Sequence, residues 1–194
     1  MKETLVELIN DNCRPVYTAR NILTFNRLYH GGAVEVREPD LKHSAEHRQD
    51  FGFGFYCTTV KEQAETWASR TSGGFKIVSV YTWNPSVLNT LRCLEFHDIA
   101  TEEGLNAWLN EIIRSRREYI PVHDFDIVAG PMSYDFVWSA VEEFAWAESA
   151  GMDLTLYRKK VRNAALGFTE PTQQIVFCTQ RAIDALIFLS SYSV

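Results

Sequence analysis

The segment Asp50–Thr59 reads DFGFGFYCTT and combines two patterns. Phe51, Phe53 and Phe55 recur at every second position, which is the period of a β-strand whose side chains alternate between its faces. Glycines fill the positions between them until Tyr56, and glycine inside a strand indicates that another group approaches the backbone closely. We therefore expect one face packed by phenylalanines and one bare face that ends at an aromatic ring. A bare face of this kind suits a planar ligand; the competing interpretation is a bulged core strand.

Composition favours one soluble, folded domain. The chain has 194 residues, of which 46% are hydrophobic and 23% charged, and disordered chains are poorer in apolar residues. The net charge of −6 argues against wholesale electrostatic binding to nucleic acid, which needs a basic surface. We find no apolar signal core and no run of transmembrane length, so we expect a cytoplasmic protein without a membrane partner. The cysteines form no C-x-x-C pair, which leaves free thiols as the simplest interpretation; they are Cys13, Cys57, Cys93 and Cys178.

Hydrophobic periodicity predicts a mixture of strands and helices. The strands do not alternate regularly with helices, so we expect an α+β fold rather than a doubly wound sheet. Residues 1–26 are predicted to be an N-terminal helical extension to a domain at 27–194. The predicted strands cover 27–32, 50–59, 75–83, 92–96, 125–129, 172–178 and 187–194, the last at a sheet edge. The predicted helices cover 60–70, begun by Thr58 or Thr59, and 101–117, 134–149, 153–165 and 179–186, the last capped by Thr179.

Three short motifs are set aside. The segment His43–His47 reads HSAEH and matches an H-x-x-E-H zinc pattern, but two histidines four residues apart share a metal only on a helix. This segment is polar and runs directly into the predicted strand, so we expect no metal. The triplet Asp50–Gly52 matches the metal-binding triplet of protein kinases without their other motifs. Gly52–Gly54 could open a dinucleotide-binding motif, yet Cys57 stands where its last glycine belongs.

Three segments together are more specific than any one of them. They are Leu28–Gly31 (LYHG), Gly52–Thr58 (GFGFYCT) and Gln173–Phe177 (QQIVF). Their order and spacing resemble the ADP-ribosyltransferase superfamily, in its diphtheria-toxin and poly(ADP-ribose) polymerase branch. The closest likeness is to an uncharacterised bacterial family with YHG and DFGxGFYxT motifs. The resemblance covers about residue 29 to the C-terminus, and it implies a split β-sheet sandwich around an NAD cleft with flanking helices.

The resemblance also implies roles for individual residues. His30 is expected to hydrogen-bond the adenosine ribose of NAD, and the backbone of Gly31 to hold the nicotinamide carboxamide. Tyr56 is expected to stack on the nicotinamide ring, beside the bare backbone at Gly54. Two further contacts to NAD follow with less support: Gln63 lies where the polymerase branch has a serine near the amide, and Trp67 lies where it has a second stacking aromatic residue. The competing interpretation of Trp67 is a helix-core residue.

The late strand departs from the family pattern, since the glutamate that completes the catalytic triad is replaced by glutamine. Gln174 is preferred to Gln173 at this position, because the related family carries its glutamine directly before the apolar run. Cleavage of the nicotinamide–ribose bond builds positive charge on the sugar, and glutamine offers a neutral hydrogen bond where a carboxylate offers charge. We expect this change to weaken transition-state stabilisation by about 1–2 kcal/mol or more, which slows the chemistry and disfavours chain elongation.

The expected activity is therefore NAD-dependent mono-ADP-ribosyl transfer to a macromolecule, with NAD as co-substrate. The acceptor is a protein or a nucleic acid, and the resemblance suggests a bacterial toxin or defence effector with a small antitoxin protein as partner. Two alternatives stay open. One is a non-catalytic module that binds NAD or ADP-ribose, and the other is an NAD glycohydrolase.

Overall fold

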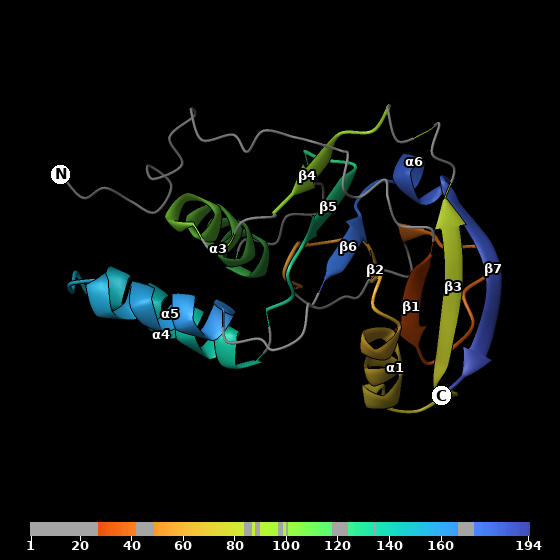
Figure 1. The fold of residues 1–194 in the computed structure, drawn as a ribbon, viewed down its shortest axis with the longest axis horizontal. Coiled ribbons are helices and arrows are strands. Elements are labelled where there is room, and N and C mark those ends of the chain that lie inside the picture. The colour runs from red at the N-terminus through yellow and green to blue at the C-terminus, as the bar shows by residue number, and fades with distance from the viewer. Residues whose placement is uncertain are drawn as a thin grey trace.

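The computed structural model describes residues 27–41, 49–83, 87, 90–96, 99, 101–117, 124–133, 135–166 and 173–194. These residues form helices and two β-sheets, so the predicted α+β class is confirmed (Figure 1). The strands are β1 (Leu28–Gly32), β2 (Phe55–Cys57), β3 (Ile77–Trp83), β4 (Cys93–Glu95), β5 (Ile127–Gly130), β6 (Gln174–Phe177) and β7 (Leu186–Ser193). The helices are α1 (Lys61–Arg70), α3 (Glu102–Arg117), α4 (Asp135–Ser149), α5 (Thr155–Leu166) and α6 (Gln180–Ile183). The extension predicted at 1–26 and the segment His43–His47 lie outside the described residues.

The two sheets meet along β1 and β2. Sheet A has the strand order β1-β3-β7, with antiparallel neighbours, and sheet B has the order β2-β6-β5-β4, in which only β4 and β5 are parallel. Tyr29 and Thr58 join the sheets through two backbone hydrogen bonds of 2.8 and 2.9 Å. The three motif-bearing strands β1, β2 and β6 are therefore successive neighbours, although β6 comes more than 100 residues after β2 in the chain.

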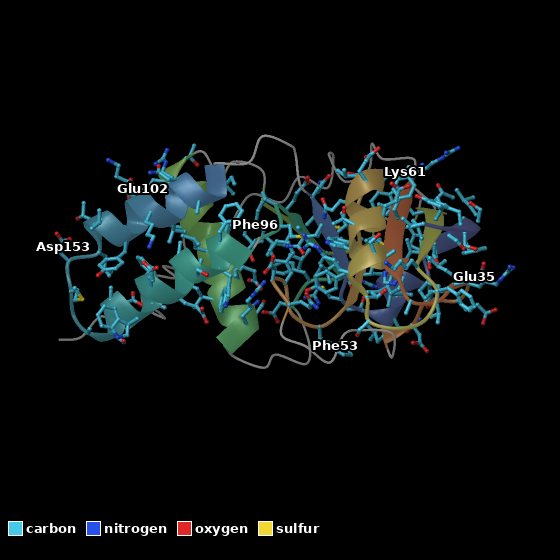
Figure 2. The ribbon with its side chains drawn as sticks, turned by 90° about the horizontal axis from the view of Figure 1, so that it is seen from below. Glu35, Phe53, Lys61, Phe96, Glu102 and Asp153 are labelled. Atoms are coloured by element: carbon cyan, nitrogen blue, oxygen red, sulfur yellow. The ribbon has the colours of Figure 1, made fainter. Side chains whose placement is uncertain are left out.

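Three hydrophobic cores follow from this arrangement. The inter-sheet core combines both sheets and includes Leu28, Phe55, Tyr81, Ile175 and Phe177. The helical core lies between sheet B and the helices α3, α4 and α5, and includes Phe51, Trp108, Val141, Val161 and Val176. The α1 core holds Ala64 and Ala68 against Val78 and Val80 of β3. Figure 2 shows the three long helices at one end, near Glu102 and Asp153, and α1 with sheet A at the other, near Lys61 and Glu35.

Helix α3 has the apolar face that its sequence predicts. The five apolar residues at helical spacing all join the helical core, and they are Leu105, Trp108, Leu109, Ile112 and Ile113. Trp108 is fully buried, and its indole Nε1 donates a hydrogen bond of 3.1 Å to the carbonyl of Pro131. This bond satisfies the only polar atom of the buried ring and fixes α3 to the segment that leads from β5 to α4.

The predicted strand at Asp50–Thr59 is too long. Only Phe55–Cys57 forms β2, and Asp50–Gly54 is a turn in which Gly52 has a φ of 74°, a conformation that favours glycine. The phenylalanines do not share a face, because Phe51 lies in the helical core and Phe55 in the inter-sheet core. A Cβ atom on Gly54 would lie 2.5 Å from Val176 Cγ1, so β6 covers this glycine. The bare face predicted for a planar ligand is therefore absent at Gly54.

Most other predicted elements are confirmed within a few residues. In β3, Val78 and Val80 face α1 while Tyr81 and Trp83 enter the inter-sheet core, as the alternation predicts. Strand β7 lies at the edge of sheet A, as predicted. The N-cap of α1 is Val60 rather than a threonine, because Thr58 Oγ1 instead accepts the Val60 N–H at 3.0 Å.

The last helix is shorter than predicted, but its cap is confirmed. Thr179 caps α6 by accepting a hydrogen bond from Ala182 N. The helix ends at Ile183 because β7 already begins at Leu186. Within the described ranges, no helix has the length and apolar content needed to cross a bilayer.

Candidate functional site

His30 lies on β1 at the junction of the two sheets. Its Nδ1 is 2.8 Å from the carbonyl oxygen of Tyr56, and its ring stacks on Phe55 with 4.5 Å between centroids. A carbonyl can only accept, so Nδ1 carries the proton of this hydrogen bond. This contact fixes the ring orientation and joins β1 to β2 beyond the Tyr29–Thr58 bridge.

Gly31 packs closely against α1 and lies on the edge of sheet A formed by β1. A Cβ atom here would lie 2.0 Å from the Ala64 carbonyl oxygen, so only glycine lets α1 pack this closely. Backbone groups of successive strand residues point to opposite sides, and those of Tyr29 point to Thr58. The N–H and C=O of Gly31 therefore point to the same edge, toward β2 and away from β3. This arrangement is compatible with the predicted carboxamide contact.

Tyr56 is half-buried and uses its hydroxyl inside the protein. The hydroxyl donates to the Gly52 carbonyl at 2.7 Å and accepts from the Phe51 N–H at 3.2 Å. Burial raises the pKa of Tyr56 well above its usual value, and the nearby Asp50 charge adds to this shift. The ring packs against the helical core. The phenol of Tyr56 is therefore neutral, and its hydroxyl stabilises the turn Asp50–Gly54, called the DFG turn below.

Gln63 and Gln173 form a clamp between α1 and β6. Gln63 Nε2 donates to the Gln173 carbonyl at 3.0 Å, and Gln63 Oε1 accepts from the Gln173 N–H at 3.3 Å. The Gln173 side chain accepts from Thr59 Oγ1 at 2.9 Å. Trp67 is half-buried and lies one turn after Gln63, on the same side of α1. The nitrogen and the oxygen of the Gln63 side-chain amide therefore both bond the residue that precedes β6.

Gln174 points away from Gln173, onto the face of sheet B that carries Val176. It is 3% exposed, and its Nε2 donates to Asp50 Oδ2 at 2.8 Å and to the Pro131 carbonyl at 3.3 Å. Two acceptors fix the orientation of the amide, because only the nitrogen can donate. Oε1 accepts no hydrogen bond from the part of the chain that the structure describes. Gln174 therefore presents a fixed acceptor beside a buried carboxylate.

Asp50 is the centre of this buried network, a role that no local sequence pattern predicts. Its carboxylate pairs with Arg116 of α3, whose Nε lies 2.8 Å from Oδ1, and accepts from the N–H and hydroxyl of Ser133. Arg116 also lies over the ring of Trp138, 4.4 Å from its centroid. A buried carboxylate is stable only when it is paired or hydrogen-bonded, and here Arg116, Ser133 and Gln174 supply the donors. The sequence could not identify Arg116 as one of these donors.

The predicted site residues fall on two faces of the junction. Tyr56 and Gln174 lie on the side of the helical core, whereas His30 packs on Phe55 on the inter-sheet side. Gly31 lies on the edge of β1 between them. Gly54 is enclosed by β6. Among the described residues, the backbones of β1 and β2 are hydrogen-bonded only at Tyr29–Thr58. The strands are unpaired beyond this bridge, where side chains from both faces lie next to the unpaired edges.

The groups that border this junction are polar. They are the N–H and C=O of Gly31, the imidazole of His30 and the acceptor Oε1 of Gln174. The carboxylate of Asp50 lies behind Gln174, paired with Arg116. These groups suit hydroxyl and carboxamide ligands. Among the residues with assigned positions, no three His, Cys, Asp or Glu side chains gather as a metal site would require.

Comparisons with known proteins give one match. No curated protein and no solved structure is significantly similar to the chain. A family model described as a protein of unknown function, DUF3990, matches residues 26–188. The match begins one residue before the described domain and contains β1, β2, β6 and the whole junction between the sheets. The chain therefore belongs to the DUF3990 family of proteins of unknown function.

Proposed function

We propose that the junction of β1 and β2 binds NAD and that the protein transfers a single ADP-ribosyl group to a macromolecule. One observation carries the proposal: beyond the Tyr29–Thr58 bridge, the N–H and C=O of Gly31 face the diverging edge of β1. A carboxamide has one acceptor and one donor side, so it complements this backbone pair. The motif resemblance described for Leu28–Gly31, Gly52–Thr58 and Gln173–Phe177 supports the same ligand, and these segments adjoin in the fold.

The remaining groups then have definite tasks. His30 accepts a hydrogen bond from a ribose hydroxyl at Nε2, while its Nδ1–H stays on the Tyr56 carbonyl. Gln174 Oε1 accepts from a second ribose hydroxyl, because Asp50 and Pro131 hold its amide nitrogen. Since Gln174 Oε1 accepts no hydrogen bond from the described residues, a ligand hydroxyl can donate to it.

The reaction breaks the bond between ribose C1′ and the nicotinamide nitrogen. Nicotinamide leaves with the bonding electrons and becomes neutral, and an acceptor nucleophile bonds to C1′ and loses a proton. Positive charge develops on the ribose as the bond breaks. Gln174 stabilises this charge only as a dipole, and the ion pair of Asp50 with Arg116 behind it contributes no net charge. We therefore expect slow turnover and single additions.

A non-catalytic NAD-binding module is the second candidate. It is favoured by a specific observation: both residues that could replace the triad glutamate are glutamines, and each has a structural contact. NAD hydrolysis is the third outcome and needs no macromolecular acceptor.

Incubation with NAD separates these three functions. NAD labelled in the nicotinamide and in the adenylate is added to the protein with and without a cell lysate. Transfer moves adenylate label into macromolecules, hydrolysis releases nicotinamide without a lysate, and a binding module does neither although it retains NAD. Gln174→Ala is expected to stop nicotinamide release, and Gln174→Glu to sustain or raise it. A dead Gln173→Ala together with an active Gln174→Ala would show that the catalytic residue is Gln173.

A further inference from the structure

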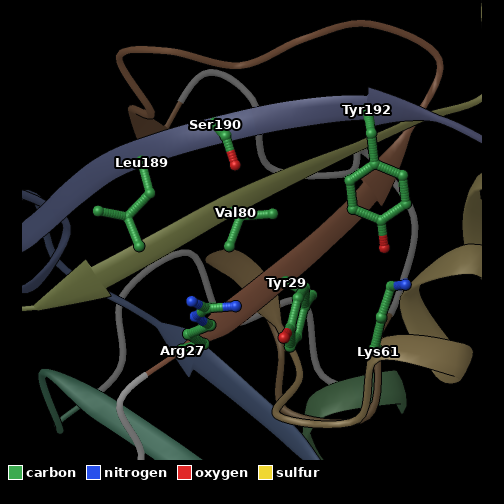
Figure 3. A pocket seen from close by; sticks show the side chains of 7 residues that line it. All are labelled: Arg27, Tyr29, Lys61, Val80, Leu189, Ser190 and Tyr192. Carbon is green, nitrogen blue, oxygen red and sulfur yellow. The ribbon is translucent and has the colours of Figure 1, made fainter.

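A pocket lies on the face of sheet A that carries Val80. It has a volume of about 340 Å³, close to the lower end of the range for small-molecule sites. Figure 3 shows its lining, which comes from the start of β1, the first residue of α1, the middle of β3 and the end of β7. The lining residues are Arg27, Tyr29, Lys61, Val80, Leu189, Ser190 and Tyr192.

Helix α1 separates this pocket from the junction of β1 and β2. Gln63 and Trp67 lie on the side of α1 toward β6, where Gln63 bonds Gln173. Glu65 lies on the other side, where it accepts a hydrogen bond of 3.1 Å from the Tyr192 hydroxyl. A ligand in the pocket therefore touches a different face of α1 from NAD at the junction.

Two cations, Arg27 and Lys61, line the pocket, and the carboxylates of Glu65 and Glu62 act on Tyr192 beside them. Lys61 lies 3.4 Å from Glu65, so its charge is compensated, and its Nζ stands 5.1 Å from the centroid of the Tyr192 ring. Arg27 is exposed and forms no ion pair with another described residue. Its guanidinium is a fork of parallel donors that matches the oxygens of a phosphate or carboxylate.

The interior of the pocket is aromatic and apolar. Val80 is 6% exposed and forms the floor, with the half-buried rings of Tyr29 and Tyr192 standing on the same face of the sheet. In Figure 3, Tyr29 lies between Arg27 and Lys61. Tyrosine faces are platforms for planar rings, and a base stacks on them whatever its identity. Ser190 adds a hydroxyl at the same level of the sheet, opposite Val80.

We infer that this pocket binds a nucleoside monophosphate group, with the base on the tyrosines and the phosphate on Arg27. The same group occurs as a free nucleotide and as the terminal nucleotide of a single-stranded nucleic acid. The inference does not depend on the proposed NAD reaction, because the pocket uses another face of α1. The two places share only Tyr29, whose side chain lines the pocket and whose backbone bonds Thr58.

Calorimetric titration with cytidine 5′-monophosphate tests the inference, since this probe lacks the adenine and nicotinamide of NAD. Cytidine without phosphate is expected to bind about tenfold more weakly, and Arg27→Gln to weaken the nucleotide about tenfold, because each removes the charged contact. Tyr29→Leu is expected to weaken it about fivefold or more through lost stacking. The matched control is Arg70→Gln, which removes an exposed cation at the other end of α1 and leaves binding unchanged.

Two results overturn the inference: no heat of binding when the nucleotide is titrated into folded wild-type protein, and equal affinity of wild type and Arg27→Gln for the nucleotide. Loss of binding in Gln174→Ala with retention in Arg27→Gln also overturns it, because the nucleotide then sits at the junction. A short single-stranded oligocytidylate with a 5′-phosphate distinguishes the two sources: tighter binding than the mononucleotide identifies a nucleic-acid end, and equal binding identifies a free nucleotide. Both results support the pocket.

Discussion

The side-chain nitrogen of Gln174 donates to the carboxylate of Asp50 over 2.8 Å, although 124 residues separate them. The contact joins the turn before β2 to the first residue of β6. Arg116 and Ser133 bind the same carboxylate, so the turn, α3, the segment after β5 and β6 all depend on Asp50. The DFG turn is thus an internal support for Gln174, and Tyr56 closes it from the other side.

Replacement of Asp50 is expected to destabilise the fold strongly. Asp50→Ala leaves Arg116, Ser133 and Gln174 without their shared partner, and removal of one member of a buried pair costs about 3 kcal/mol or more. The free energy of unfolding in urea measures the loss. Asp124→Ala is the control, because Asp124 is exposed and its replacement should cost less than about 0.5 kcal/mol. A loss below 1 kcal/mol for Asp50→Ala, by the same order-of-magnitude scale, contradicts its central position.

Tyr56→Phe is expected to lower the free energy of unfolding by about 1–2 kcal/mol. The substitution keeps the ring but removes the hydroxyl that bonds Gly52 and Phe51, and it leaves those backbone groups unpaired. Thermal and chemical denaturation measure the effect. Tyr157→Phe is the comparison, since that hydroxyl has only a long contact of 3.9 Å with a methionine sulfur. Equal stability losses in the two variants would rule out a special structural task for the Tyr56 hydroxyl.

The two glycines after His30 are expected to respond differently to alanine. Gly31→Ala places a Cβ 2.0 Å from the Ala64 carbonyl, so α1 must move and we expect a loss of about 3 kcal/mol. The Cβ of Gly32→Ala lies 3.2 Å from His30 Nε2 and 3.9 Å from the Val34 carbonyl oxygen, and the fold should tolerate it. Gly32→Ala should instead weaken NAD binding by crowding Nε2. Melting curves and calorimetry on both variants separate the two effects.

Asp126 is expected to make stability depend on acid pH. Burial opposes its ionisation, but hydrogen bonds from the Arg92 N–H, Thr179 and Arg181 outweigh burial and lower the pKa of this carboxyl. A lowered folded pKa gives stability that is present above the unfolded pKa of about 4 and is lost as pH falls through the folded value. The difference in unfolding free energy between wild type and Asp126→Asn should therefore be constant from about pH 5 to 7 and shrink below about pH 4. A difference that stays constant down to about pH 3 contradicts this.

Local patterns predicted the elements whose packing is itself local. Helix α3 and strand β3 follow their periodicities closely, because each of their buried faces packs against one core. Helix α3 has one such face, and β3 has the α1 core on one face and the inter-sheet core on the other. The DFG turn did not follow its period, since Phe51 and Phe55 enter different cores and Gly52 needs a positive φ. Alternating phenylalanines in a sequence cannot show whether their side chains share one core or enter two.

For the candidate site, the sequence predicted which strands lie together, and its function stays a prediction. The resemblance identified the strands that adjoin, and these strands are neighbours in the fold. The direction of Gln173 and Gln174, and the enclosure of Gly54, depend on register with β2 and on the buried Asp50. These are tertiary contacts between residues more than 100 positions apart, and no local pattern contains them.

Titration of NAD into wild type and His30→Phe is the most direct test of the central claim, that the junction of β1 and β2 binds NAD. His30→Phe keeps a ring that can stack on Phe55 and removes both ring nitrogens, Nε2 and the Nδ1 that bonds the Tyr56 carbonyl. Calorimetry is expected to show one NAD per wild-type chain and about tenfold weaker binding to the variant, which loses its hydrogen bond to NAD, and a melting curve checks that the variant is folded. Two results would contradict the claim. One is no binding to the folded wild type at about 1 mM NAD, which means a binding free energy weaker than about −4 kcal/mol. The other is equal affinity in both proteins.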